Sequence, residues 1–132
     1  MLSLIRDYRN PAVLWGLTLL FTFVITACGS AAIGANNRGF EYYKLGQYDR
    51  AIQDYDEAIR LDPQLAVVYN NRGLAYNELG QYERAIKDFG EAIRLDPKDA
   101  DAYRNRGLTY EAIGKSEEAE RDFAKAKELP YE

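Results

Sequence analysis

The chain has 132 residues, of which 47% are hydrophobic and 29% charged, and its formal net charge is −4. This length and composition are ordinary for a single globular domain. Histidine is absent and Cys28 is the only cysteine, which removes imidazole acid–base chemistry, Cys/His metal sites and intramolecular disulfides. The mildly acidic charge argues against nucleic acid as a partner, because binding phosphates needs a basic stripe. We therefore expect a protein without cofactor or metal that is not an enzyme.

The first strongly apolar stretch covers residues 12–27, follows Arg6 and Arg9, and reads AVLWGLTLLFTFVITA. At about 16 residues it is shorter than the ~20 that a membrane-spanning helix needs and is typical of a signal peptide. Its end, Ile25-Thr26-Ala27-Cys28, resembles the lipobox of bacterial lipoproteins. That resemblance implies cleavage before Cys28 and lipidation of Cys28. We expect residues 1–27 to be a signal peptide or membrane anchor and residues 28–34 a short linker.

An uncleaved single-pass helix is the alternative for this segment. The uncharged chain up to Ala35 gives about 24 residues, enough to span a bilayer with tilt. Under either hypothesis, Arg6 and Arg9 place the rest of the chain outside the cytoplasm, by the positive-inside bias. For a lipoprotein in a bacterium with two membranes, the resemblance implies the outer membrane, because Gly29 stands where an Asp is associated with inner-membrane retention.

The remainder of the chain repeats itself every 34 residues. NNRGFEYYKLGQYDRAIQDYDEAIRLDP is followed by NNRGLAYNELGQYERAIKDFGEAIRLDP and the weaker RNRGLTYEAIGKSEEAERDFAKAKELP. A period of about 34 residues is typical of stacked helix pairs. The residues at these intervals resemble the tetratricopeptide-repeat (TPR) pattern: Gly39, Gly73, Gly107; Tyr42, Tyr76, Tyr110; Ala51, Ala85, Ala119; Tyr55, Phe89, Phe123; Ala58, Ala92, Ala126; Pro63, Pro97.

This resemblance implies an all-α fold, with three TPR helix-turn-helix repeats forming a short right-handed α-solenoid. The TPR domain would cover residues 35–132, with repeats at about 32–65, 66–99 and 100–132. We predict helices near residues 33–45, 48–61, 66–79, 82–95, 99–113 and 116–129.

Each repeat contains residues suited to close helix pairing. The small residues allow two helices to approach, and the aromatic residue of the second helix fills the space between them. Gly46, Gly80 and Gly114 are predicted to cap the first helices, and the Asp-Pro pairs at 62–63 and 96–97 to end the second.

One arginine and one aspartate recur sixteen residues apart in each repeat, which predicts an ion pair between the two helices. The pairs are Arg38 with Asp54, Arg72 with Asp88, and Arg106 with Asp122. The alternative is that these arginines face a ligand.

The third repeat differs from the others on its second helix. Glu120 and Lys127 replace the isoleucines at 52, 59, 86 and 93, where a further repeat would stack. Because terminal repeats need a polar outer face, we expect the array to end here. Phe40, Tyr42 and Tyr43 leave apolar surface on the first helix for the membrane, a partner or another copy.

In TPR proteins the first helices line a concave groove that receives a peptide or a partner helix. The resemblance implies these groove positions: Ile33, Asn36, Asn37, Phe40, Tyr43, Lys44; Val67, Asn70, Asn71, Leu74, Asn77, Glu78; Asp101, Arg104, Asn105, Leu108, Glu111, Ala112. The recurring asparagines need an explanation, since asparagine is a mediocre helix former. Their amides either bind a peptide backbone or hold neighbouring helices together; both hypotheses stay open.

Chaperone-binding TPR domains hold a C-terminal carboxylate with two lysines, an arginine and two asparagines. Only Asn71 fits this pattern, and the other places hold Asn36, Phe40, Asp101 and Asn105. With Lys44 and Arg104 as the only groove cations, we expect a neutral or modestly basic protein partner. The predicted function is a membrane-tethered binding module. The alternatives are self-association and a hydrolase using carboxylate pairs such as Asp54 with Asp56 or Glu117 with Glu118.

Overall fold

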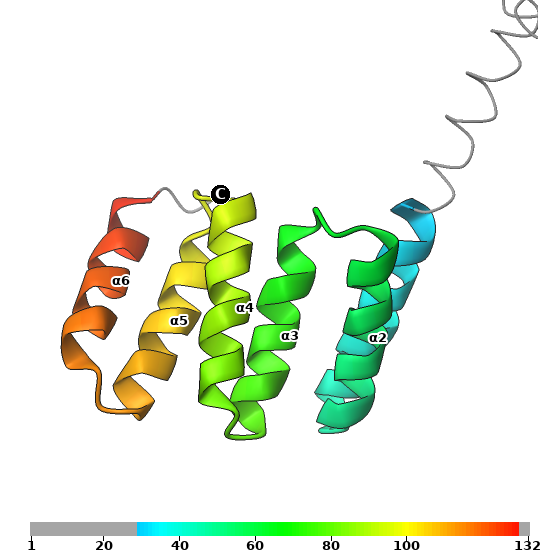
Figure 1. The fold of residues 1–132 in the computed structure, drawn as a ribbon, viewed down its shortest axis with the longest axis horizontal. Coiled ribbons are helices and arrows are strands. Elements are labelled where there is room, and N and C mark those ends of the chain that lie inside the picture. The colour runs from blue at the N-terminus through cyan, green and yellow to red at the C-terminus, as the bar shows by residue number, and fades with distance from the viewer. Residues whose placement is uncertain (1–28, 130–132) are drawn as a thin grey trace, which may run out of the picture.

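The computed structural model describes residues 29–129, and every secondary-structure element among them is an α-helix. The helices are residues 29–44, α2 (Tyr48–Leu61), α3 (Ala66–Glu78), α4 (Tyr82–Leu95), α5 (Ala100–Ala112) and α6 (Ser116–Glu128). From α2 to α6 they follow one another across Figure 1 in chain order, with helix 29–44 behind α2. The predicted all-α stack of three helix pairs is therefore confirmed for the described residues.

The predicted boundaries of α2 to α6 are correct to within one residue, whereas the start predicted for the first helix is wrong. Residues 29–34 are helical, so the part of the expected linker that the structure describes belongs to the first helix. This segment contains two alanines, which have the highest helix propensity, but also two glycines, and it has no proline, so propensity alone does not explain the helix. Ala32 and Ala35, three residues apart on one face, are almost fully buried, which ties the segment to the core. The predicted signal segment and Cys28 lie outside the described residues.

The predicted glycine caps end the first helix of every repeat. Gly46, Gly80 and Gly114 have φ angles of 71°, 71° and 77°, in the left-handed region that favours glycine. In the first repeat Gly46 N donates to Tyr43 O and Gln47 N donates to Tyr42 O, both at 2.9 Å, which is the Schellman arrangement. Equivalent bonds recur after α3 and α5. The same tight turn therefore brings each second helix back against its partner.

The second helices α2 and α4 end before proline, as predicted. Asp62 and Asp96 stand at their C-caps in extended conformation. Each aspartate side chain then accepts a hydrogen bond at 3.0 Å from a backbone N–H two residues later. These local bonds set the direction in which the next repeat begins.

A glycine and an aromatic ring make the closest contact within each repeat. A Cβ built on Gly39, Gly73 or Gly107 would lie 2.8, 2.7 or 2.7 Å from a ring carbon of Tyr55, Phe89 or Phe123. Contacts this short leave no room for any larger residue. The interpretation of these glycines as sites of close helix approach is confirmed.

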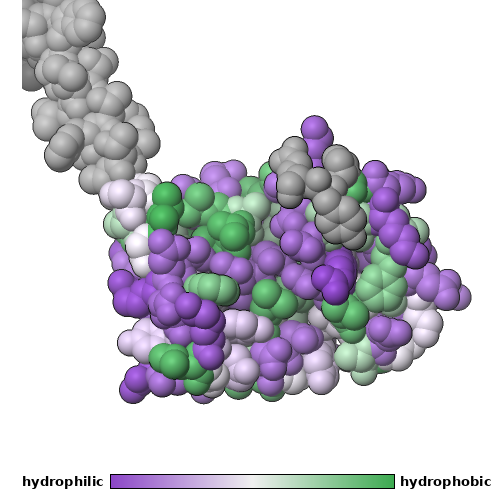
Figure 2. Space-filling model, turned by 180° about the vertical axis from the view of Figure 1, so that it is seen from behind, coloured by the Kyte–Doolittle hydropathy of each residue, from purple (hydrophilic) through white to green (hydrophobic). Residues whose placement is uncertain are grey.

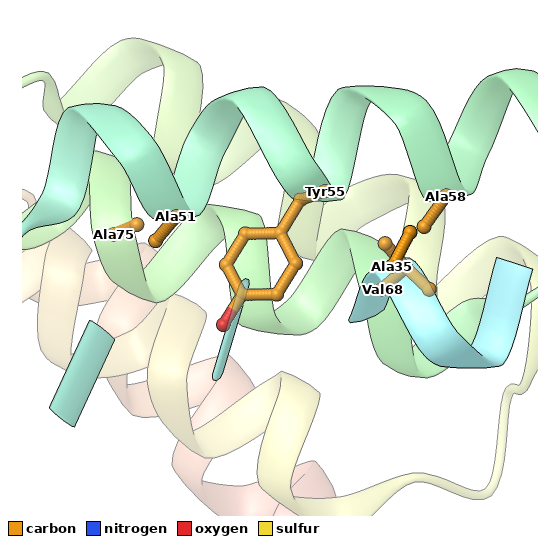
Figure 3. Packing of buried hydrophobic residues seen from close by; sticks show 6 residues of the cluster. All are labelled: Ala35, Ala51, Tyr55, Ala58, Val68 and Ala75. Atoms are coloured by element: carbon orange, nitrogen blue, oxygen red, sulfur yellow. The ribbon is translucent and has the colours of Figure 1, made fainter. Parts of the chain in front are cut away.

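The core is built mainly from alanines around one large ring per repeat. Figure 3 shows the Tyr55 side chain pointing from α2 into a cluster of small residues. The members of this cluster are Ala35, Ala51, Tyr55, Ala58, Val68 and Ala75. Val68 and Ala75 come from α3, so the core is continuous from one repeat to the next.

The three predicted arginine–aspartate pairs are all present. Arg38 binds Asp54 at 2.6 Å, Arg72 binds Asp88 at 2.7 Å, and Arg106 binds Asp122 at 2.7 Å. Each arginine donates from Nε and Nη2 to the two oxygens of its aspartate, a bidentate geometry. These arginines hold the two helices of a repeat together.

The polar outer surface predicted for the last repeat is also present. Glu120 and Lys127 are exposed on α6. Their counterparts in the earlier repeats, Ile52, Ile59 and Ile93, pack against the core clusters at the junctions with α3 and α5.

Candidate protein-binding surface

The first helices of the three repeats form one continuous surface, which we call the first-helix face. Asn71 Nδ2 on α3 donates to Asn36 Oδ1 on helix 29–44 at 3.0 Å. Asn105 Nδ2 on α5 donates to Asn70 Oδ1 on α3 at 3.1 Å. Helix α3 is also in direct contact with α5. The three helices of this face therefore lie side by side.

The two hypotheses for the asparagines have different outcomes. The hydrogen bonds confirm that Asn36, Asn70, Asn71 and Asn105 connect neighbouring repeats. Binding of a peptide backbone by these amides stays a prediction. Asn37 is exposed, and its side chain has no hydrogen-bond partner among residues 29–129.

A second side-chain bond joins α3 and α5 and is not among the sequence-based predictions. The Thr109 hydroxyl is 3.1 Å from Asn77 Oδ1 and 2.9 Å from its own helix's Asn105 carbonyl oxygen, either of which can accept its proton. Thr109 is only 1% exposed. Its signal in the sequence was a hydroxyl at the position that holds Ala75 one repeat earlier.

Apolar side chains project from this face into solvent. Ile33, Phe40, Val67 and Leu108 are 44–53% exposed, and with Leu45 they make up all the exposed large hydrophobic residues of the described chain. Phe40 and Leu108 occupy the same position of the first and third repeats, with the half-buried Leu74 between them. Ile33 lies seven residues before Phe40, and Val67 seven before Leu74, so each pair shares one side of its helix.

These apolar residues give the first-helix face its chemical character. Figure 2 looks at the molecule from the side of helix 29–44 and shows separate hydrophobic patches among hydrophilic residues. The asparagines lie three or four residues from the apolar positions on the same helices. The face therefore alternates amides with apolar side chains, so it can offer a partner both hydrogen bonds and apolar contacts.

Aromatic rings gather where the first helix ends. The rings of Phe40 and Tyr43 stack at 6.5 Å, and Tyr43 meets Tyr48 at 5.5 Å. Lys44, one of the two predicted groove cations, lies 5.3 Å from the Phe40 ring centre and binds Glu41 at 2.7 Å. Burial and the neighbouring Glu78 carboxylate raise the pKa of Tyr43.

The charges of the face leave little positive potential. Lys44 is paired with Glu41, so Arg104 is the one groove cation without an ion pair among residues 29–129. Glu78 is exposed on α3, and Asp101 and Glu111 are exposed on α5. This balance gives no cluster of cations that could hold an anionic ligand.

The carboxylates considered for hydrolysis are held in structural roles. Asp54 binds Arg38, whereas Asp56 binds Arg72 of the next repeat at 2.6 Å. Glu117 and Glu118 stand in the first turn of α6, where negative charge favours the helix N-terminus. Within the described chain no group of acidic, histidine or cysteine residues could hold a metal ion. The described helices also include none that is long and apolar enough to cross a membrane.

Comparisons with known proteins agree with this architecture. A family model of the TPR repeat matches residues 39–80 and 73–114, and a model of the tetratricopeptide repeat matches residues 100–131. No curated protein sequence matches the chain.

Many solved structures are similar to this chain. The second TPR domain of Spaghetti (RPAP3), bound to the HSP90 peptide SRMEEVD, is 37% identical over 76% of this chain and 93% of that chain, with a TM-score of 0.73. The second TPR domain of human RPAP3, in complex with the HSP70 peptide SGPTIEEVD, is 36% identical over 75% and 82%, with a TM-score of 0.72. The TPR domain of Arabidopsis OM64 is 33% identical over 77% and 84%, with a TM-score of 0.76. By its repeats, its helix pairing and these matches, the chain belongs to the tetratricopeptide-repeat family.

Proposed function

We propose that this protein is a membrane-tethered interaction module that holds a peptide segment or helix of another protein on its first-helix face. The proposal rests on the exposed apolar side chains of that face, chiefly Phe40 and Leu108. The interrepeat amide bonds hold the helices that present them in fixed positions. A preformed surface loses little conformational freedom on binding. The similar TPR domains with bound peptides support this class of function.

The chemistry of the face favours a neutral or modestly basic partner with apolar side chains. The peptides bound to the similar domains end in EEVD and are acidic. On this chain the clamp positions hold Asn36, Phe40, Asp101 and Asn105 in place of the expected cations and second asparagine, and Asp101 would repel such a ligand. A different occupant, with apolar residues spaced to meet Phe40 and Leu108, suits the surface better.

Site-specific photo-crosslinking in the native host tests the binding face. A photoreactive residue would replace Asn37 or Arg104 on the first-helix face, or Gln53 or Lys87 on second helices; all four are exposed. We expect positions 37 and 104 to capture the same protein, and positions 53 and 87 not to capture it. Equal capture from all four positions would contradict the assignment of the face.

A matched pair of variants then separates binding from folding. Phe40→Ala combined with Leu108→Ala should abolish the crosslink, because it removes the exposed apolar contacts and leaves every buried core residue in place. Leu45→Ala is the control, since Leu45 is 69% exposed but lies in the turn after the first helix. An unchanged crosslink in the folded double variant would show that these side chains do not bind the partner.

The tether belongs to residues outside the described range and is tested separately. We infer from the lipobox resemblance that the mature chain begins at a diacylglyceryl-modified Cys28 in the cell envelope. Mass spectrometry of the purified protein should then find this modified N-terminus and no peptide from residues 1–27. An N-terminus at Met1 would favour the single-pass anchor instead.

A further inference from the structure

The three structural arginines differ in how many of their donors are used. Arg72 has a complete set of carboxylate partners: Nε and Nη2 donate to Asp88, and Nη1 donates to Asp56 of the preceding repeat at 2.6 Å. Despite the opposing effect of burial, these hydrogen bonds raise the pKa of Arg72. Two second helices, α2 and α4, are thereby connected through one guanidinium.

Arg106 repeats this arrangement with one partner missing. Its Nε and Nη2 donate to Asp122 at 2.7 and 2.8 Å, as in the preceding repeat. The residue that corresponds to Asp56 is Gly90, and a Cβ built there would lie 3.7 Å from Arg106 Nη1. Nη1 has no hydrogen-bond partner within residues 29–129. Nη1 is not among the fully buried polar atoms that lack a partner, so part of its surface is open to solvent.

The guanidinium of Arg106 is held in position although one donor is free. The rings of Tyr103 and Tyr110, on the same helix, lie 5.8 and 6.0 Å from its Cζ atom. The Arg106 side chain is only 22% exposed, and Asp122 fixes its plane. A ligand would therefore meet a donor whose orientation is already set.

We propose that the notch formed by Arg106 Nη1 and Gly90 accepts a carboxylate from an aspartate or glutamate of a partner protein. The Asp56–Arg72 contact shows, within the same molecule, that a carboxylate fits this position. Arg106 and Asp122 together carry no net charge. One added carboxylate would give this site a net charge of −1, which is the charge of Arg72 together with Asp88 and Asp56. A phosphate, with more negative charge beside Asp122, would be disfavoured. The notch lies between second helices and provides a contact separate from the first-helix face.

Acetate is the probe, titrated at constant ionic strength into the full chain in detergent micelles. The side-chain Nε signals of the arginines are followed by NMR. We expect a saturable shift of Arg106 and none of Arg72, whose notch is filled by Asp56. Phosphate should shift Arg106 less than acetate does at the same ionic strength.

Three substitutions make the test specific to the notch. Gly90→Asp should abolish the acetate response by supplying an internal carboxylate. Gly90→Ala should keep the response, because Asp56 itself carries a Cβ at the equivalent position. Asp56→Gly should make Arg72 respond. The proposal is overturned if exposed Arg50 and Arg84 shift as much as Arg106, if Gly90→Asp keeps the response, or if phosphate shifts Arg106 more than acetate does.

Discussion

Tyr55 carries a buried hydroxyl that makes no hydrogen bond, the one buried side-chain polar atom of this kind in the described chain. Phe89 and Phe123 occupy the same position in the other repeats without a hydroxyl. A buried donor without a partner has lost its hydrogen bonds to water and gained none in return. The Tyr55 ring therefore stabilises the fold through its packing, whereas the buried Tyr55 hydroxyl destabilises it.

Tyr55→Phe should leave the ring contacts intact and raise the free energy of unfolding by roughly 1 kcal/mol. Phe89→Tyr is the matched reverse change and should lower it by about 1–3 kcal/mol, because it buries a new hydroxyl. Urea unfolding followed by circular dichroism measures both. A loss of stability in Tyr55→Phe would mean that the hydroxyl has a partner.

The titration of Tyr55 makes the stability of the fold depend on pH, in a direction that follows from its pKa. Burial, with the nearby Tyr43 and Asp54, raises the pKa of Tyr55 above its usual value near 10. Above about pH 10 the unfolded chain then releases a proton that the folded chain keeps, so stability is complete below pH 10 and falls as pH rises further.

Wild type should therefore lose up to about 1.4 kcal/mol per pH unit more than Tyr55→Phe in alkaline solution. Urea midpoints measured between pH 8 and 11 would show this difference. Parallel curves for the two proteins would contradict a neutral, buried Tyr55.

At the scale of helices, glycine has two opposite effects in this fold. Gly73 allows α3 to approach the Phe89 ring on α4, where a Cβ would lie 2.7 Å from a ring carbon. Gly90 stands within α4, and outside that helix a Cβ there would meet, among residues 29–129, only the side chain of Arg106 within 4 Å, at 3.7 Å. Packing requires the first glycine, whereas the second lowers the helix propensity of α4 and leaves Arg106 Nη1 uncovered.

Gly73→Ala should lower the free energy of unfolding by about 1–3 kcal/mol, because its Cβ would overlap the fully buried Phe89 ring. Gly90→Ala should raise it by about 0.5–1 kcal/mol through helix propensity. Thermal and urea unfolding of the two variants, side by side, would test this opposition. Equal effects would show that the core near Gly73 can relax.

The sequence predicted the features that recur with the 34-residue period. The glycine caps, the Asp-Pro stops and the arginine–aspartate pairs are local or repeat identically, so one repeat explains the others. The early start of the first helix depends on the burial of Ala32 and Ala35 against the core. The 34-residue repeat of the sequence does not show this burial, so the start was not predicted. The Thr109–Asn77 bond was missed for a similar reason, since it occurs at one junction only.

The candidate surface was predicted less completely than the fold. The asparagines attracted notice because they are unusual in helices, and most of them proved to bind one another. Leu108 was a predicted groove position only through the TPR resemblance, since an apolar residue at helical spacing is usually part of the core. Its 45% exposure became evident only once the neighbouring helices were in place.

At the scale of the whole molecule, both ends of the described stack carry residues unsuited to further stacking. Val68 and Ala75 of α3 are fully buried at the junction with α2, whereas Gly34 and Glu41 hold the equivalent positions of helix 29–44 and are exposed. At the other end Glu120 and Lys127 replace isoleucines. Apolar stacking surface is thus confined to the interior junctions.

Restoring isoleucine at Glu120 and Lys127 should turn the outer surface of α6 into a stacking surface and cause concentration-dependent association. Arg121→Ile with Lys125→Ile is the control, because these positions are polar in every repeat. Sedimentation velocity would compare the two variants. Association of both to the same extent would indicate non-specific hydrophobicity in place of a repeat-specific surface.

The helix that spans residues 29–44 without a break has one more consequence. A helix advances only about 1.5 Å per residue, so Gly29 lies roughly 4–5 Å along the axis from the buried Ala32. If Cys28 carries a lipid, the repeats have almost no slack with which to search the space above the bilayer. The repeats would then rotate only as far as this short connection to the lipid allows. A partner would have to present its binding segment at a fixed distance from the bilayer and at a fixed angle to it.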